Sequence, residues 1–456
     1  MIDTELIRKD PKKFVTLVNL RGNINKVDIY RWLELDSKRK DLIKKRDEIN
    51  RKRNLISKND NQHRITNREL GRKLKEELEY VQKELDVIQQ EWQEMLYWIP
   101  NIFLEDVPPG TSEDENIEIK VWDGEKYMPS NKIGNKSLSA KYQKSYPIKG
   151  DIQFTPKPHW EIGTVLNLLN IDKATKTSGS RFYYLVGYGV LIVNAVFDLM
   201  FKKLLSEGFI PVIVPLLVKE KVLYGSSHFP GDKDQIYRIS SDNLENPNET
   251  LYLIGSSEPS NFAYFMDTTL DYKKLPIKIM AQSSCFRSEV GSWGKDVRGI
   301  KRAHQFDKLE MNVIMEANIE KAREMHEYLL SLNEWLLQTI GIPYRVINMC
   351  IGELGYYAAA KKYDVEFWSP SQQCYIEIMS NSITTDYQAR RLNIKYIDSS
   401  GKTQYAYTLN DTAVTHRILI AILEHYQQSD GSLLIPEAIR YYVGRDKITP
   451  EDTIIL

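Results

Sequence analysis

Residues 27–98 carry their apolar positions in a seven-residue pattern. The second half of this stretch alternates spacings of four and three through Leu74, Leu78, Val81, Leu85, Ile88, Trp92 and Met95. The first half repeats every seven residues through Leu35, Leu42, Ile49 and Ile56. Heptad positions of this kind lie along one face of a helix. The polar run KNDNQHRIT at 58–66 interrupts the pattern, so we predict two long helices joined by a turn, an antiparallel coiled-coil arm.

Beyond residue 155, short β-rich runs alternate with amphipathic helices. RVINMC, VEFWS and CYIEIM are typical of strands, whereas LNEWLL at 332–337 and RILIAILEHY at 417–426 are typical of helices. AQSSCFRSE at 281–289 alternates as a strand does, and KRAHQFDKLEMNVIM at 301–315 can be its antiparallel partner across a basic glycine-containing loop.

The apolar stretch 183–201 is the segment that most resembles a membrane span. Polar or small residues interrupt it at Gly187, Gly189, Asn194 and Asp198. A spanning helix needs about 20 mostly apolar residues. We therefore predict a helix buried in the protein or in an interface, and no membrane association.

The composition changes at 100–150, where proline, glycine and acidic residues become frequent, and we interpret this stretch as a connector. The predicted domains are residues 1–105 with the arm at about 27–98, a connector at 106–150, and a second domain at 151–456.

Composition says little about the partners and the cellular location of the protein. The 456 residues include 62 Lys and Arg and 62 Asp and Glu, so any nucleic-acid surface must come from local charge. The N-terminal sequence MIDTELIRKDPKKF lacks an apolar signal-peptide core. The three cysteines have no disulfide-like or zinc-like spacing, and together these features predict a cytoplasmic protein.

The predicted arm carries a first candidate binding surface, a cluster of cations. Residues 38–53 hold nine Lys and Arg against Asp41, Asp47 and Glu48. Such a run is either a solvated coiled-coil face or a contact for a phosphate backbone, because clustered cations gain by releasing counterions. Charge alone leaves both interpretations open.

The predicted hairpin carries a second candidate. Arg287 and Glu289 are two residues apart, so on a strand both side chains point to one face, which Phe306 and Glu310 share on the partner strand. Arginine can grip a phosphate or carboxylate through two hydrogen bonds, and Phe306 can stack on a planar base. A nucleotide and an amino acid would fit this set, but so would an ordinary charged hairpin with cross-strand ion pairs.

FRSE, followed by a loop and RAHQFDKLE, resembles motif 2 of the class II aminoacyl-tRNA synthetases, and HQFDKLE resembles the seryl-tRNA synthetase family in particular. The resemblance covers nearly the whole chain. It includes NIFLEDVPPGTSEDEN, PHWEIG, AAAKKYDVEFWSPSQ, TDYQARRLNIKY and LLIPEAIRYYVG.

The resemblance implies an α+β fold, with an antiparallel catalytic sheet flanked by helices and an N-terminal tRNA-binding arm. It also implies a homodimer, with motif 1 at the interface in the helix from about Val190 to Glu207 and the following GFIPVIVP, which ends at Pro215.

Site roles follow from the resemblance residue by residue. Arg287, Glu310 and Arg417 would be catalytic. ATP would be held by Arg287, Ser288, Glu289, Ala303, Phe306, Glu377, Ile378, Met379, Ser380 and Arg417, with Mg²⁺ on Glu377 and Ser380. Serine would be held by Ser256, Ser257, Glu258, Arg287, Glu310, Asn410 and Thr412. The arm residues expected to meet tRNA are Lys38, Arg39, Lys44, Lys45, Arg46 and Arg53.

The chain departs from the family pattern at three places. Ser256-Ser257-Glu258 stands where Thr-Ala-Glu is usual, and Ile383 where asparagine is frequent. The stretch NDTAVTHR, from Asn410 to Arg417, is one residue shorter than expected before the arginine. We expect these polar residues to form a tighter loop, and the packing of the helix at 417–426 to keep Arg417 facing the ATP site.

The leading hypothesis is a serine–tRNA ligase that forms seryl-adenylate from L-serine and ATP and transfers serine to the 3′ end of the serine tRNA. Whether the selenocysteine tRNA is also charged stays open. Two alternatives are a synthetase-like regulatory protein without chemistry and an amino-acid ligase for another acceptor. The four residues Arg287, Glu289, Glu310 and Glu377 argue against the first, and the basic arm argues against the second.

Overall fold

The computed structural model describes residues 1–22, 26–58, 64–127, 154–240, 250–290, 298–355 and 357–452. The turn of the predicted arm, most of the basic loop after Val290 and the end of the predicted connector lie outside these residues. No helix among the described residues is long and apolar enough to cross a membrane.

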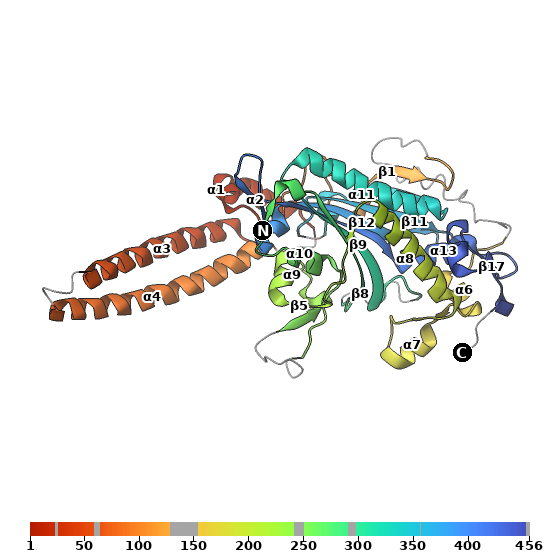
Figure 1. Cartoon of the computed structure of the whole chain (residues 1–456), viewed down its shortest axis with the longest axis horizontal. Coiled ribbons are helices and arrows are strands. Elements are labelled where there is room, and N and C mark those ends of the chain that lie inside the picture. Colours follow the sequence, from red (N-terminus) through yellow and green to blue (C-terminus); the bar gives the residue numbers. More distant parts are fainter. Residues whose placement is uncertain are drawn as a thin grey trace. The chain divides into compact units, whose positions relative to one another are not determined.

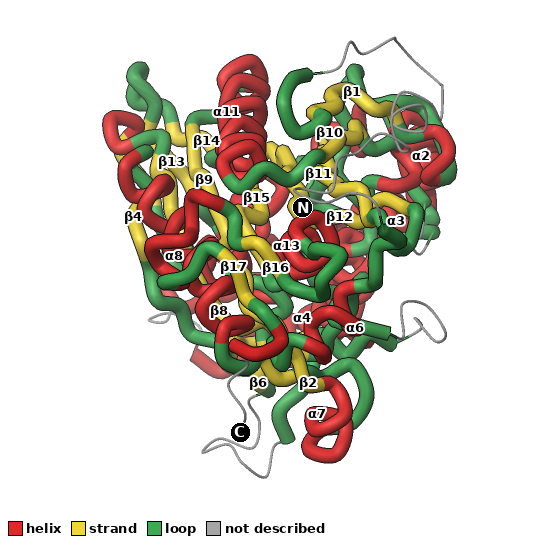
Figure 2. The backbone as a smooth tube through the Cα atoms, turned by 90° about the vertical axis from the view of Figure 1, so that its right-hand side faces the viewer, coloured by secondary structure: helices red, strands yellow, loops and turns green. Residues whose placement is uncertain are grey.

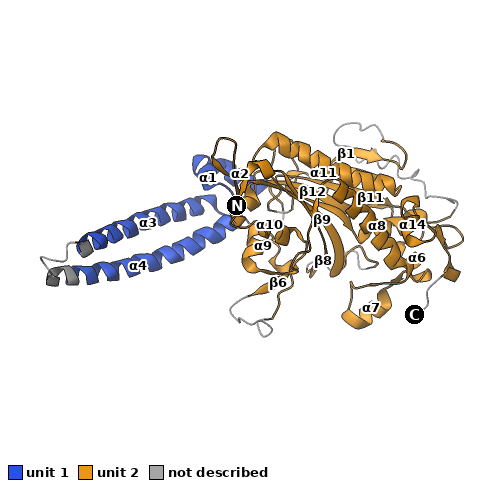
Figure 3. Cartoon of the chain, in the orientation of Figure 1, with its two compact units in different colours: residues 1–20, 24–100 blue, residues 21–23, 101–456 orange. Residues whose placement is uncertain are grey.

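The chain divides into two compact units, coloured separately in Figure 3. One comprises residues 1–20 and 24–100, and the other comprises residues 21–23 and 101–456.

The first unit is helical. It consists of α1 (Thr4–Lys9), α2 (Pro11–Leu20), α3 (Ile29–Lys58) and α4 (Arg64–Tyr97). The last two run side by side as the predicted antiparallel pair (Figure 1). Leu35, Ile49, Leu74 and Val81 are buried between them, so the heptad positions form the seam that the pattern predicts.

An eight-stranded sheet organises the second unit (Figures 1 and 2). Its strand order is β1-β10-β11-β12-β15-β9-β8-β4, and only the pair of β4 with β8 is parallel. The strands are β1 (Ile117–Trp122), β4 (Ile210–Pro211), β8 (Ile277–Phe286), β9 (Gln305–Met315), β10 (Tyr344–Asn348), β11 (Lys361–Ser369), β12 (Cys374–Thr385) and β15 (Tyr407–Thr415). This is the antiparallel sheet with flanking helices that we predicted.

Three helices cover one face of the sheet. α8 (Tyr188–Ser206), α11 (Ile319–Thr339) and α13 (Arg417–Tyr426) bury apolar side chains against Leu309, Met311 and Val313 of β9. Because side chains alternate along a strand, Lys308, Glu310 and their neighbours in register point to the other face. The predicted buried helix at 183–201 is therefore α8, which packs in the core of its own chain.

The other face of the sheet is bordered by α9 (Glu220–Ser226), α10 (Glu258–Ala263) and α12 (Tyr387–Leu392). The remaining elements are α6 (His159–Val165), β2 (Leu169–Asn170), α7 (Ile171–Ser178), β3 (Tyr184–Leu185), β5 (Leu217–Lys219), β6 (Leu251–Leu253), β7 (Thr269–Asp271), β13 (Lys395–Ile397), β14 (Thr403–Tyr405), α14 (Arg440–Val443), β16 (Leu433–Leu434) and β17 (Lys447–Ile448).

Two local predictions are wrong. The strand at 281–289 ends at Phe286, so Arg287 and Glu289 lie beyond it, and Glu289 has a positive φ of 50°. The stretch from Asn410 to Thr415, predicted as a loop, is part of β15, whose backbone pairs with β9 and β12. In both cases the number of residues in the ladder is set by the partner strands, which the local sequence does not record.

Candidate active site

A polar cavity of about 920 Å³ opens on the face of the sheet that α8, α11 and α13 leave uncovered. Its walls come from segments far apart in sequence: His228, Asp232, Gln235, Ile236, Gly255, Ser256, Glu258, Arg287, Glu289, Val290, Arg302, Lys308, Glu310, Lys362, Glu377, Ser380, Ser382, Asn410 and Thr412. Many charged groups of both signs meet here, as recognition of a zwitterion or a polyanion requires.

The floor of the cavity follows from strand alternation. On β9, Lys308 and Glu310 share the face that Phe306 occupies. Thr412 lies directly opposite Glu310 on β15. The three polar groups are in contact: Lys308 Nζ lies 2.5 Å from Glu310 Oε2 and donates to Thr412 Oγ1 at 3.2 Å.

Glu310 is buried in this cluster, and burial raises its pKa to about 7. The positive charge of Lys308 opposes that rise, whereas the negative charge of Glu258 adds to it. Burial and Glu258 therefore favour the neutral form of this carboxyl, whereas the contact with Lys308 favours the carboxylate.

Glu258 supplies a second carboxylate from the start of α10. Its Oε1 accepts from Gln388 Nε2 at 2.6 Å and from Asn410 Nδ2 at 3.2 Å. Ser256 Oγ accepts from the Glu258 backbone N–H at 3.3 Å. Ser257 is buried, and its hydroxyl donates to the Ala281 carbonyl at 3.4 Å, so only Ser256 and Glu258 of the triplet face the cavity.

Arg287 lies just beyond the end of β8. Its guanidinium stands 5.3 Å from the Phe306 ring centroid, and its Nε donates to the Gly255 carbonyl at 3.3 Å. Stacking on the ring and this hydrogen bond fix the guanidinium plane at the cavity wall. It lines the same cavity as Glu310 and Glu377, and its charge favours the ionised form of both carboxyls.

Glu289 and Ser288 complete the segment after the strand. Arg302 Nη1 contacts Glu289 Oε2 at 3.2 Å, and Ser288 Oγ donates to the Asp234 carbonyl at 2.5 Å. Glu289 lines the cavity from the segment beyond β8 and not from a strand face. Ala303 and Phe306 are buried behind this wall.

Glu377 and Ser380 both face the cavity although they are three residues apart on β12. Simple alternation would put them on opposite faces. The β11 register shifts here, with Asp364 opposite Ser380 and Glu366 opposite Glu377, and this bulge brings both side chains to one face. Ile378 and Met379 are buried between them, so their side chains point away from the cavity.

Arg417 is the first residue of α13, and its side chain contacts Glu377. Its Nη1 donates to the Glu377 carbonyl at 2.8 Å and lies 3.5 Å from Glu377 Oε2. Burial opposes ionisation of Glu377, but Arg417, Lys362 and Arg287 outweigh it and hold the pKa of this carboxyl below its usual range. Arg417 thus stays beside Glu377 despite the shorter segment before it, and Ile418, Leu419, Ile422 and Leu423 are fully buried.

Several lining residues were not predicted. His228, Asp232, Gln235 and Ile236 come from the loop after α9, which carries no periodic signal. Lys308 could have been found, because it alternates with Phe306 and Glu310 in HQFDKLE. Ile383, by contrast, is buried in the core, so this departure from the family pattern does not touch the cavity lining.

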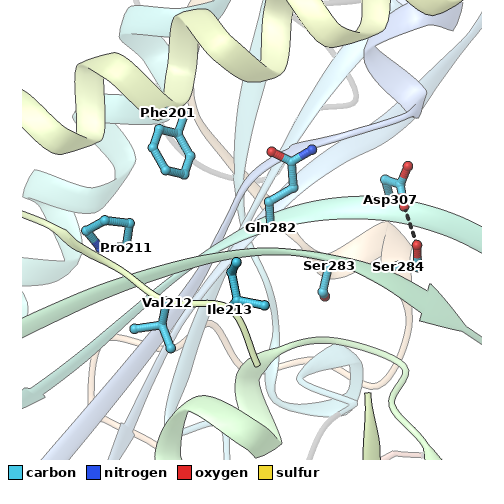
Figure 4. Close-up of a pocket in the computed structure, with 8 residues that line it drawn as sticks. All are labelled: Phe201, Pro211, Val212, Ile213, Gln282, Ser283, Ser284 and Asp307. Atoms are coloured by element: carbon cyan, nitrogen blue, oxygen red, sulfur yellow. Dashed lines mark hydrogen bonds between the residues drawn. The ribbon is translucent and has the colours of Figure 1, made fainter. Parts of the chain in front are cut away.

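A second hollow of about 650 Å³ lies on the other face of β8 (Figure 4). Its lining joins Phe201 of α8, Pro211 to Ile213 and the outward-facing Gln282, Ser284 and Asp307. Ser284 Oγ donates to Asp307 Oδ1 at 2.7 Å, as the dashed line in Figure 4 shows. Its few titratable groups make it a poor candidate for chemistry.

Comparisons with known proteins agree on the family. The family described as seryl-tRNA synthetase N-terminal domain matches residues 1–103, and the class II tRNA synthetase core domain (G, H, P, S and T) matches residues 237–426. A serine–tRNA ligase of Dictyoglomus turgidum is 37% identical over 461 residues, covering 99% of this chain and 100% of its own.

Solved structures give the same result. The seryl-tRNA synthetase of Pyrococcus horikoshii, complexed with ATP, has a TM-score of 0.84 at 33% identity and covers 99% of this chain and 100% of its own. The cytoplasmic serine–tRNA ligase of Naegleria fowleri, in complex with AMP, has a TM-score of 0.79 at 29% identity, with 98% and 99% covered.

Proposed function

Because the chain belongs to the seryl-tRNA synthetase family and is an ATP-dependent serine–tRNA ligase, we propose that the polar cavity is where it joins L-serine to tRNA. The observation that carries this assignment is the position of Arg287. Its guanidinium is held at the cavity wall by Phe306 and the Gly255 carbonyl, and it lines the same cavity as the carboxylates of Glu258, Glu310 and Glu377.

The part of the cavity around Glu310 and Glu258 suits serine. The substrate ammonium would lie between Glu310 and Glu258, and its hydroxyl would reach Thr412 and Glu310, with Asn410 and Ser256 closing the wall. The serine carboxylate would then point to Arg287. A site that hydrogen-bonds the hydroxyl rejects alanine, because its buried polar groups would be left unpaired.

The part of the cavity around Arg287 and Glu377 suits ATP. Arg287 would meet the α-phosphate and Arg417 the γ-phosphate, while Phe306, Ala303 and the backbone near Ser288 would border adenine and Glu289 would accept from its amino group. The contact of Arg287 with Phe306 and that of Arg417 with Glu377 support this assignment of the two arginines.

The proposed reaction needs positioning and charge stabilisation, and no protein nucleophile. A serine carboxylate oxygen attacks the α-phosphorus, the bond to the bridging oxygen breaks, and pyrophosphate leaves with its electron pair. A terminal ribose hydroxyl of tRNA then attacks the acyl carbon and AMP leaves. Arg287 would stabilise the charge that gathers on the α-phosphate oxygens.

Mg²⁺ is the proposed partner of the triphosphate. The ion prefers oxygen ligands and usually takes only one or two from the protein, the others being phosphate and water. The ionised Glu377 and the Ser380 hydroxyl fit this requirement, because the bulge in β12 turns both toward the same cavity. The ion would neutralise phosphate charge when bound.

We assign tRNA binding to the N-terminal unit. Lys38 and Lys44 are exposed on α3, and Lys45, Arg46 and Arg53 lie on the same helix. Arg39 also has a structural role, since its guanidinium lies 4.3 Å from the Trp92 ring centroid and donates to Gln89. The remaining cations are the better candidates for phosphate contacts.

A homodimer is proposed through the α8–β4 region. Ile213 is 98% exposed and lines the hollow of Figure 4, and Leu205 and Ile210 are more than half exposed. Exposed aliphatic side chains on α8, on β4 and just after β4 favour a protein partner. The free cysteines fit the reducing cytoplasm that we propose as the location.

Serine-dependent exchange of pyrophosphate into ATP tests the first step, and charging of purified serine tRNA tests the second. We expect both to proceed with the wild-type protein. Absence of exchange would favour a regulatory protein without chemistry. Exchange without tRNA charging would favour another acceptor.

A further inference from the structure

Lys308 holds a position in the cavity floor that the assigned roles leave unexplained. Its side chain is only 7% exposed, yet it carries a charge. Its Nζ lies 2.5 Å from Glu310 Oε2 and 3.2 Å from Thr412 Oγ1, the two groups assigned to serine. A buried lysine is costly unless it is paired, so this contact has consequences for both partners.

The first consequence concerns protons. An ammonium group can only donate hydrogen bonds, so Thr412 Oγ1 must accept from Lys308. The hydroxyl proton of Thr412 is then available to an acceptor, and Glu310 Oε2 lies 3.4 Å away. A substrate hydroxyl that contacts both groups and replaces this hydrogen bond would accept from Thr412 and donate to Glu310. An alanine methyl group could do neither.

The second consequence concerns charge. The charged and titratable groups around Glu310 are Glu258 of α10, Arg287 beyond β8 and Cys285 of β8. Asp411 of β15 acts on Glu310 only through its charge, because its carboxylate accepts from Asn333 of α11. Among the described residues, Lys308 is the cation whose contact with Glu310 the structure records as an ion pair. Without it, Glu258 and burial would both favour the protonated form of Glu310.

We propose that Lys308 is a positioning residue of the serine subsite, which keeps Glu310 a carboxylate and Thr412 a hydrogen-bond donor toward the substrate hydroxyl. This inference rests on the proposed function, because it concerns how that subsite recognises serine. Lys308 acts through its two partners, so its loss should change serine recognition and leave ATP recognition almost intact.

The test compares Lys308→Met with Lys361→Met. Lys361 is a matched control on β11 of the same sheet. It is equally buried at 7% exposure and contacts Asp106 Oδ2 at 2.5 Å, but it does not line the cavity. Lys308→Arg keeps the charge, and Lys308→Gln keeps a donor without charge. The measurement is pyrophosphate exchange at varied serine and varied ATP, from about pH 6 to about pH 8.5.

At pH 7, Lys308→Met should raise the KM for serine about ten- to a hundredfold and leave the KM for ATP within about twofold. Since Lys308 lowers the pKa of Glu310, its removal moves this pKa upward, so the KM for serine should fall back as the pH rises. Lys308→Arg should restore the wild-type pH profile. Lys308→Gln should show the shifted profile but reject alanine better than Lys308→Met.

If Lys308→Met and Lys361→Met have equal effects on both KM values and leave the pH profiles unchanged, the ion pair of Lys308 has only a structural role and the inference is wrong. If Lys308→Met does not fold, Lys308→Gln carries the same pH prediction, and a wild-type profile in that variant overturns the inference. Absence of serine-dependent exchange in the wild type is a different result, since it overturns the proposed function itself.

Discussion

Arg287 is the residue on which the proposed chemistry depends most, and replacing it gives the sharpest test. In Arg287→Ala the guanidinium that serves both the serine carboxylate and the α-phosphate is lost. The same change removes the group that stacks on Phe306 and donates to the Gly255 carbonyl. We expect serine activation to collapse while the fold survives, because Arg287 lies after the last residue of β8 and outside the sheet ladder.

The magnitude follows from the contacts. A hydrogen bond to a charged group contributes about 1.5–3 kcal/mol, so losing two of them costs about 3–6 kcal/mol of transition-state stabilisation. At about 1.36 kcal/mol for each factor of ten, kcat/KM should fall about 10²- to 10⁴-fold. Arg287→Lys keeps the charge without the planar fork and should lie between the wild type and Arg287→Ala.

The assay is pyrophosphate exchange, with thermal unfolding as the measure of folding. Arg345→Ala is the matched control, because Arg345 also lies over an aromatic ring, 3.7 Å from the Tyr375 centroid, and pairs with Glu366 on the same sheet outside the cavity. That control should lose stability and keep exchange activity. A loss of less than about tenfold in Arg287→Ala would refute the assignment of two anions to this residue.

The remaining predictions concern the triphosphate, the arm and the interface. Arg417→Ala should raise the KM for ATP at least about tenfold while the KM for serine changes little, because it removes the cation beside Glu377; equal, small changes in both would deny its contact with the γ-phosphate. Replacing Lys38 and Lys44 by glutamine should weaken tRNA binding and reduce its salt slope by about one for each lost phosphate contact, with exchange activity unchanged; an unaltered slope would identify a solvated surface. Ile213→Glu should shift the protein from dimer to monomer in light scattering, and a retained dimer would place the interface elsewhere.

The arm and the helix at 417–426 show what local sequence can specify. A heptad repeat records which helix face is buried, and the four aliphatic side chains after Arg417 record the orientation of their helix. Each of these two patterns lies within a single stretch of the chain. The resemblance to a known family extended this to an antiparallel sheet flanked by helices and to nine of the nineteen residues that line the cavity, because long motifs such as HQFDKLE specify more than their own periodicity.

Registers and bulges, however, were decided by the tertiary structure. Glu377 and Ser380 share a face only because β11 and β12 shift register between them, and Asn410 lies on a strand because β9 and β12 pair with it on both sides. His228 and Asp232 reach the cavity through a loop that no pattern marks.

The sequence by itself therefore determined the helical arm, the alternation of β9 side chains between the two faces of the sheet, and the charged residues available to the cavity. Only the tertiary structure decided which of those charges meet. Lys308 and Glu310 of β9 contact Thr412 of β15, which is 104 and 102 residues away, and Glu258 of α10 contacts Asn410 of β15, which is 152 residues away. These contacts exist only when the sheet has assembled. Periodicity reports forces that act within one element, whereas a buried charge cluster depends on the packing of several.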